Sequence, residues 1–246
     1  MTDGIVRLVA VSRTFRMGDV QVPVLHDVTF DVREGESVAV VGPSGSGKSS
    51  LMNLIGLLDR PSAGRIFLEG VETGRLSADR CAILRNRRIG FVFQAYNLLA
   101  RHSALDNVQL PLIYAGVGRA ERRRRAERAL DSVGLAHRAD HLPTRLSGGE
   151  QQRVAIARAL VTDPGIVLAD EPTGALDSRT GSDILGLFQA LNAAGRTILI
   201  ITHDRGVAAG CGRVVRLQDG RVVSEDRAAP GLDGRSADSV MAEASV

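Results

Sequence analysis

The spacing of apolar residues predicts strands in the first third of the chain. Residues 28–32 alternate between apolar and polar side chains, which is typical of a strand with one buried face. Residues 37–41 are almost continuously apolar and predict a buried strand of the parallel kind. A glycine-rich segment and a predicted helix over residues 49–58 follow this strand directly. Further short strands are expected at residues 66–68 and 89–93.

The middle of the chain, residues 97–160, is helical in character, and strand signals return after it. Strands are expected at residues 166–169, 197–201 and 214–217, with helical patterns between them. Strands that alternate with helices indicate βαβ units, so the sequence predicts an α/β fold with a mainly parallel sheet. Breaks in the helical region are expected at Pro111, Gly116, Gly118, Gly134 and Pro143.

Length and composition favour one folded domain that does not cross a membrane. A chain of 246 residues with 44% hydrophobic residues can bury one large core. Its apolar runs fall well short of the roughly 18 residues needed to span a bilayer, and its N-terminus does not resemble a secretory signal. Cys81 and Cys211 indicate neither a disulfide framework nor a metal site, which favours a reducing cytosol. We expect one domain over residues 1–226 and a disordered tail over residues 227–246, which lack periodicity.

The chain is weakly basic, with a formal net charge of +3. Its densest basic run, Arg122–Arg125, lies in a predicted helix that also carries acidic residues. Ala126, Leu130 and Val133 are spaced to line the apolar face of this helix. We interpret the run as a solvated helix face, with an anionic partner, either nucleic acid or lipid headgroups, as the alternative.

The segment GPSGSGKSS, residues 42–50, carries the strongest chemical signal. It satisfies the phosphate-loop pattern G-x-x-x-x-G-K-[ST] between a predicted strand and a predicted helix. In such a loop, backbone N–H groups and the helix N-terminus surround phosphate oxygens. We expect the lysine to lie across the β- and γ-phosphates of a nucleotide and Ser49 to offer its hydroxyl to Mg²⁺. The expected nucleotide-binding residues are Gly42, Pro43, Ser44, Gly45, Ser46, Gly47, Lys48, Ser49 and Ser50.

Lys48 is the only lysine of the chain, whereas the other 30 basic residues are arginine. Arginine is bulkier and planar, and its guanidinium is shaped for edge-on bidentate pairing. We interpret the exception as a requirement for a slim point charge inside a tightly wrapped loop.

Two carboxylates, Asp170 and Glu171, follow the apolar residues 166–169. Asp170 can hold Mg²⁺, directly or through water. Glu171 can orient and deprotonate an attacking water, a general-base role worth about 10²–10⁴ in rate.

The stretch LSGGEQ, residues 146–151, predicts a helix that begins with a capping box of Ser147 and Glu150. A capped helix preceded by two glycines presents free N–H groups and a favourable dipole to an anion. The phosphate loop already provides one anion-binding site, and one γ-phosphate does not need two anion-binding sites from the same subunit.

In this order, the motifs resemble those of the ATP-binding cassette (ABC) ATPases over about residues 5–225. The resemblance implies a P-loop NTPase core with a mainly parallel sheet, an N-terminal antiparallel β subdomain and a helical subdomain inserted at about residues 95–160. It also implies that Phe15 stacks on adenine, that Gln94 contacts Mg²⁺ and the water, that Asp177 lies in the loop crossing a dimer, and that His203 contacts the γ-phosphate.

The resemblance further implies ATP hydrolysis with Mg²⁺ by a homodimer. Two chains would pair head to tail, so that each ATP lies between Lys48 of one chain and Ser147, Gly148 and Gly149 of the other. ATP would close the pair by binding the closed state more tightly, and hydrolysis would release it.

Within the family, the chain is similar to the ATPases of macrolide-exporter and lipoprotein-release systems, on residues 56–61, 87–99 and 169–178. This similarity implies a separate integral membrane permease whose coupling helix docks around residues 95–115. It implies a position on the cytoplasmic face of the membrane and the export or extraction of a hydrophobic substrate, peptide or lipoprotein. Ala100 stands where a proline is usual, and Glu150 where many members carry glutamine.

Three other hypotheses are weighed against a transporter subunit, and the stretch LSGGEQ argues against one of them, a cytosolic P-loop kinase. An ATPase that pairs with a permease-like protein in cell division and moves no substrate fits the same motifs. A chromosome-associated ABC ATPase fits poorly, because Lys48 and Ser147 are about a hundred residues apart without heptads between them. We therefore expect no nucleic-acid partner.

Overall fold

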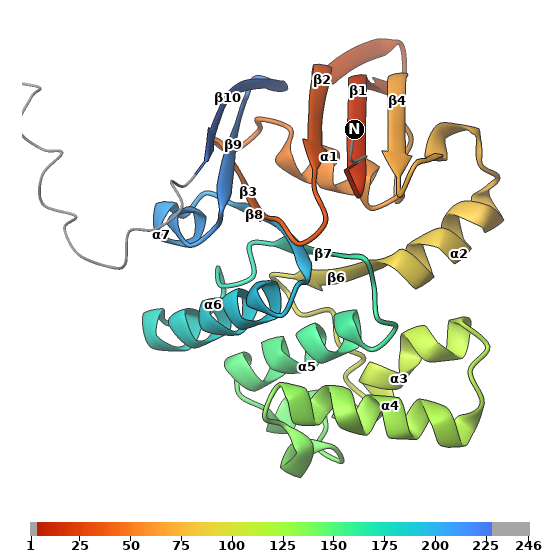
Figure 1. The fold of residues 1–246 in the computed structure, drawn as a ribbon, viewed down its shortest axis with the longest axis vertical. Coiled ribbons are helices and arrows are strands. Elements are labelled where there is room, and N and C mark those ends of the chain that lie inside the picture. The colour runs from red at the N-terminus through yellow and green to blue at the C-terminus, as the bar shows by residue number, and fades with distance from the viewer. Residues whose placement is uncertain (1–3, 228–246) are drawn as a thin grey trace, which may run out of the picture.

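The computed structural model describes residues 4–227, which form two sheets with helices packed around the second (Figure 1). The tail expected over residues 227–246 lies outside the described residues, except for Arg227, which is the last residue of a strand.

The first sheet is antiparallel, with four strands in the order β2-β1-β4-β5. Leu8 of β1 pairs with Phe30 of β2 on one side and with Ile66 of β4 on the other, and all three side chains are buried. This row of apolar side chains gives the sheet its buried face and confirms the expected antiparallel β subdomain. The strands are β1 (Val6–Met17), β2 (Val20–Val32), β4 (Ala63–Leu68) and β5 (Val71–Glu72).

The second sheet has six strands in the order β10-β9-β3-β8-β7-β6, of which only β10 is antiparallel to its neighbour. The expected mainly parallel sheet is therefore confirmed. Its strands are β3 (Ser37–Val41), β6 (Ile89–Phe93), β7 (Ile166–Asp170), β8 (Thr197–Thr202), β9 (Arg213–Gln218) and β10 (Arg221–Arg227).

Four of these parallel strands end at the same edge of the sheet. Val41 of β3 pairs with Thr202 of β8. Asp170 of β7 lies between Ile201 of β8 and Phe93 of β6. The segments that follow these four strands therefore leave the sheet side by side, which is where parallel α/β sheets place their ligand sites.

Helices cover both faces of the parallel sheet. Val38 and Val40 face α1 and the antiparallel sheet, and Leu51 of α1 packs in the same cluster. Ala39 points to the other face, where it shares a cluster with Val154 of α5. This alternation along β3 separates α1 from α5 by the thickness of the sheet. Helix α1 (Lys48–Ile55) therefore covers one face of the sheet. The other face is covered by α5 (Gly148–Leu160), α6 (Ser178–Ala193) and α7 (Arg205–Ala209).

A helical region lies below the sheet in Figure 1 and is built from α3 (Ala104–Tyr114), α4 (Arg119–Ser132) and α5. The break expected at Pro111 was wrong, because Pro111 lies inside α3. The helix begins with a capping box of Ser103 and Asp106, and its apolar side is buried. These interactions offset the cost of about 3 kcal/mol for a proline inside a helix.

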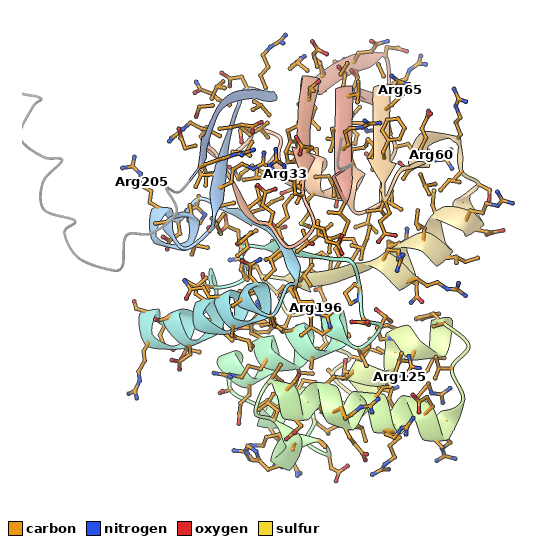
Figure 2. All side chains as sticks on the ribbon, in the orientation of Figure 1. Arg33, Arg60, Arg65, Arg125, Arg196 and Arg205 are labelled. Carbon is orange, nitrogen blue, oxygen red and sulfur yellow. The ribbon has the colours of Figure 1, made fainter. Side chains whose placement is uncertain are left out.

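Three of the four arginines in the basic run are paired with acidic residues of α4 itself. Arg123 Nε lies 2.8 Å from Glu127 Oε1, and Arg125 Nε lies 2.7 Å from Glu121 Oε1. Arg124 also pairs with Glu121. Of the arginines labelled in Figure 2, Arg65 lies on β4, Arg125 on α4 and Arg205 on α7, and the others lie in loops. The ion pairs on α4 favour a solvated helix face over an anionic partner.

Several elements were not predicted individually from the sequence: β1, β5, α2, α7 and β10. Helix α2 (Ala78–Arg88) buries none of its residues, and β10 is largely exposed. Both lack the apolar periodicity that identifies an element.

Gly90 sets the distance between β6 and the helix α5 that packs on it. A Cβ at Gly90 would lie 2.5 Å from the carbonyl oxygen of Ala159. We expect Gly90→Ala to lower the free energy of unfolding by about 1–3 kcal/mol, because α5 must shift outward. Urea unfolding measures this change.

Gly186→Ala is the matched control. An added Cβ at this exposed position of α6 meets nothing within 4 Å among residues 4–227. This variant should be neutral, or more stable by up to about 1 kcal/mol. Equal unfolding midpoints for both variants would contradict the close packing of α5 on β6.

Candidate active site

The phosphate loop connects β3 to α1 and requires glycine at several positions. Gly45 and Gly47 have φ angles of 80° and 98°, which side chains rarely adopt. A Cβ at Gly47 would also lie 2.9 Å from the carbonyl oxygen of Val24, and one at Gly42 would lie 2.0 Å from that of Leu217. The loop is thus wrapped closely against β2 and β9, and its backbone turns in a way that other residues could not follow.

Lys48 is the first residue of α1, and its ammonium group lies over the loop. The Nζ atom donates to the carbonyl oxygens of Gly42 and Pro43, at 2.8 Å each. The Ser46 hydroxyl, 2% exposed as a residue, has no hydrogen-bond partner among the described residues. An unsatisfied buried hydroxyl costs roughly 1–3 kcal/mol, which an anionic acceptor can recover. The loop therefore fits a phosphate chain.

Asp170 ends β7 close to this loop. Burial, and then the charge of Glu171, raise the pKa of the Asp170 carboxyl, whereas the Lys48 ammonium lowers it. Among residues 4–227, no group of three or more His, Cys, Asp or Glu residues is arranged to hold a metal ion. A magnesium ion here would therefore rely on a single carboxylate together with hydroxyl, amide and phosphate oxygens, a combination that suits Mg²⁺.

Glu171 follows Asp170 and is held by the end of β8. Its φ angle of 44° lies in the left-handed region, and its backbone N–H donates to the carbonyl oxygen of Ile201 at 2.8 Å. The carboxylate oxygen Oε1 lies 2.6 Å from Nδ1 of His203 and accepts from the His203 backbone N–H at 3.0 Å. The other oxygen, Oε2, accepts from the Thr202 hydroxyl at 3.1 Å.

Gln94 directly follows β6 and is exposed. A Cβ at Gly174 would lie 2.7 Å from Gln94 Nε2, so the amide lies against the segment that follows Glu171. The strand register therefore places the phosphate loop, Gln94, Asp170, Glu171 and His203 at one edge of the sheet.

Ser147 begins α5 with the expected capping box. Its hydroxyl accepts from Glu150 N at 3.2 Å, and the Glu150 carboxylate accepts from Ser147 N at 2.8 Å. This second hydrogen bond is the largest cause that lowers the pKa of Glu150. Gly149 packs against α6, because a Cβ there would lie 2.4 Å from Thr180 Cγ2. Helix α5 packs on the face of the sheet opposite α1, the helix that Lys48 begins.

Asp177 and Phe15 lie further from the strand ends. The Asp177 side chain caps α6 by accepting from Thr180 N at 3.0 Å, and the interaction with Thr180 lowers the pKa of Asp177. Phe15 is 37% exposed, and the Arg13 guanidinium lies 4.4 Å from the centre of its ring. Phe15 pairs with Val22 in the strand pair β1–β2, which also borders the phosphate loop.

Three polar residues around the site were missed in the sequence. Besides Thr202, the fully buried Gln152 donates from Nε2 to the carbonyl oxygen of Pro172 at 2.6 Å. Arg158 donates to the carbonyl oxygens of Tyr96 and Asn97, two residues with φ angles of 59° and 50°. Each contact joins segments that are distant in sequence, and no local pattern marks it.

A groove of about 890 Å³ lies between α2, β6, α3 and α5. Its lining includes Ile83, Phe91 and Tyr114, together with Arg87 and Arg158. The side chains of Ile83 and Tyr114 are open to solvent, at 55% and 81% exposure. Within the described part of the chain, every helix is too short or too polar to span a membrane.

Comparison with known proteins identifies the family. The sequence model described as ABC transporter matches residues 25–174. An uncharacterized ABC transporter ATP-binding protein of Thermotoga maritima is 51% identical over 223 residues, which are 91% of this chain and 95% of that protein. The macrolide export ATP-binding/permease protein MacB of Brucella melitensis biotype 1 is 50% identical over 90% of this chain, which spans only 34% of that relative.

A solved structure agrees with this assignment. The dimeric, post-hydrolysis structure of an ATP-binding cassette bound to ADP and Pi is 45% identical, covers 90% of this chain and 98% of its own, and superposes with a TM-score of 0.83. The chain therefore belongs to the ABC transporter ATP-binding family.

Proposed function

We propose that this chain is the ATP-hydrolysing subunit of an ABC transporter and works as a head-to-tail homodimer beneath a membrane permease. The observation that carries the proposal is the distribution of anion-binding groups. The phosphate loop, Asp170 and Glu171 lie at one edge of the parallel sheet, whereas Ser147 begins a helix on the face opposite α1. A second copy completes the site.

In this proposal the phosphate loop, residues 42–50, binds the phosphates of ATP. The loop N–H groups, the N-terminus of α1 and the Lys48 ammonium supply positive charge, and the Ser46 hydroxyl gains an acceptor. Phe15 offers an exposed ring to the adenine. Ser49, Gln94 and Asp170 would hold Mg²⁺, which when bound neutralises charge on the β- and γ-phosphates.

Glu171 is proposed as the general base for hydrolysis. Its carboxylate is held at both oxygens, which orients it to take a proton from the attacking water. His203 has a largely exposed side chain beside Glu171, and this position suits a contact with the γ-phosphate. Gln94 lies against the segment that follows Glu171 and would report the state of the nucleotide to a docked partner.

The second chain contributes Ser147, Gly148 and Gly149 to each ATP. The N-terminus of α5 presents N–H groups and the positive end of its dipole, which stabilise an anion. Asp177 caps α6, which packs beside Gly149, and the loop around Asp177 would cross to the partner chain. The dimeric state of the solved relative supports this arrangement.

The groove between α2 and α3 is proposed to receive the coupling helix of an integral membrane permease. Exposed apolar side chains line it, and MacB relatives carry both an ATP-binding and a permease part by name. The dimer would then lie at the cytoplasmic face of the membrane and drive export or extraction of a hydrophobic substrate, peptide or lipoprotein. The alternative is a permease-like partner in cell division that moves no substrate.

The shape requirement at Lys48 is tested by Lys48→Arg. We expect a loss of about a hundredfold or more in the rate of ATP hydrolysis, because a planar guanidinium does not fit over the Gly42 and Pro43 carbonyls. Lys48→Gln, which removes the charge, is the comparison variant, and its rate of ATP hydrolysis should be no lower than that of Lys48→Arg. Wild-type turnover in Lys48→Arg would refute the argument from shape.

The pairing of two chains around ATP is tested by Glu171→Gln. This variant keeps the shape of the base but cannot accept the proton, so it should accumulate an ATP-bound dimer in size-exclusion chromatography. Adding Ser147→Asp preserves a good helix cap but places a negative charge beside the partner's γ-phosphate. The double variant should remain monomeric with ATP; a dimer that forms equally well would count against this interface.

Docking of the permease is tested by Ile83→Asp. Placing a charge in the groove should abolish co-purification with the membrane permease, while ATP-dependent dimerisation is retained. Val223→Asp on β10 is a matched control, because Val223 is 53% exposed but lies outside the groove. Equal recovery of the permease with both variants would show that the groove is not the docking site.

A further inference from the structure

We propose that Thr202 is a positioning residue for hydrolysis, because its hydroxyl holds one oxygen of the Glu171 carboxylate in place. This inference rests on the proposed function, in which Glu171 is the base. Thr202 is the last residue of β8 and is only 1% exposed.

The direction of the Thr202 hydrogen bond is determined by its neighbours. A hydroxyl has one proton to donate and two lone pairs to accept with. The backbone N–H of Asp204 donates to Thr202 Oγ1 at 3.0 Å, which occupies a lone pair. The proton of Thr202 is then directed to Glu171 Oε2 at 3.1 Å, because an ionised carboxylate only accepts.

The two oxygens of Glu171 are held by different groups. Oε1 contacts both the imidazole and the backbone N–H of His203, whereas Oε2 is held by Thr202. In the proposed reaction the His203 side chain, 74% exposed, turns to the γ-phosphate. The carboxylate then keeps one hydrogen bond on each oxygen, from the His203 backbone and from Thr202. Hydrogen bonds to both oxygens restrict rotation of the carboxylate about the Cγ–Cδ bond, so its free lone pairs remain aimed at the water in the proposed reaction.

The backbone of Glu171 is fixed independently of Thr202. Its N–H is bound to the Ile201 carbonyl, and Gln152 donates to the carbonyl of the next residue, Pro172. The remaining freedom of Glu171 is in its side-chain torsions, and the Thr202 hydroxyl restricts these.

Thr197 provides a matched structural control. It begins the same strand, is also 1% exposed, and its hydroxyl accepts from Gly35 N at 3.0 Å. Replacing either threonine by valine keeps the branched shape and removes one buried hydroxyl. Only Thr202→Val removes a donor from Glu171, so the pair separates positioning from a general loss of stability.

The experiment compares steady-state ATP hydrolysis with Mg²⁺ in Thr202→Val, Thr202→Ser, Thr197→Val and Glu171→Gln. We expect Thr202→Val to lower kcat by about ten- to a hundredfold while the KM for ATP changes by less than about twofold. Thr202→Ser, which retains the hydroxyl, should recover most of kcat. Thr197→Val should keep the wild-type kcat. Adding Thr202→Val to Glu171→Gln should leave the ATP-induced dimer unchanged, because binding does not use this contact.

Three results would overturn the proposal: a wild-type kcat in Thr202→Val, an equal loss in Thr197→Val, or no recovery in Thr202→Ser. If Glu171→Gln is inactive in the same experiment, each of these three results leaves the proposed function intact. Wild-type hydrolysis by Glu171→Gln would instead refute the assignment of the base, and with it the role of Thr202.

Discussion

The register of the parallel sheet is the constraint on which the site depends. Because Val41 pairs with Thr202, and Asp170 lies between Ile201 and Phe93, the segments after β3, β6, β7 and β8 emerge together at one edge. A one-residue slip of a strand would turn its side chains to the opposite face and displace the group that follows it. The core residues of these strands therefore position the chemistry, although none of them contacts the nucleotide in the proposed reaction.

The same sheet also separates the two helix N-termini that can bind phosphate. Helices α1 and α5 pack on opposite faces, and in the proposed site only the N-terminus of α1 serves the acidic residues of its own chain. A triphosphate that is bound from both sides requires a second copy. This separation gives a physical reason for the proposed ATP-dependent pairing, in which the nucleotide supplies the charge that joins the two surfaces.

Local sequence patterns predicted much of this architecture, for identifiable reasons. The continuous apolar runs of β3, β6 and β7 and the glycines of the phosphate loop have signatures that need no long-range information. Helix α2 and strand β10 bury too little to show periodicity, and the Pro111 break failed because capping and packing stabilise α3. The contacts of Thr202, Gln152 and Arg158 join distant segments, so only the fold could show them.

The central claim is that one γ-phosphate is bound by two chains. A crystal structure with a non-hydrolysable ATP analogue and Mg²⁺ tests it most directly. We predict that the γ-phosphate lies within hydrogen-bond distance of Lys48 of one copy and of Ser147 Oγ and Gly149 N of a second copy, at roughly 2.7–3.2 Å. A nucleotide contacted by a single chain, with the N-terminus of α5 facing solvent in every copy, would contradict the account.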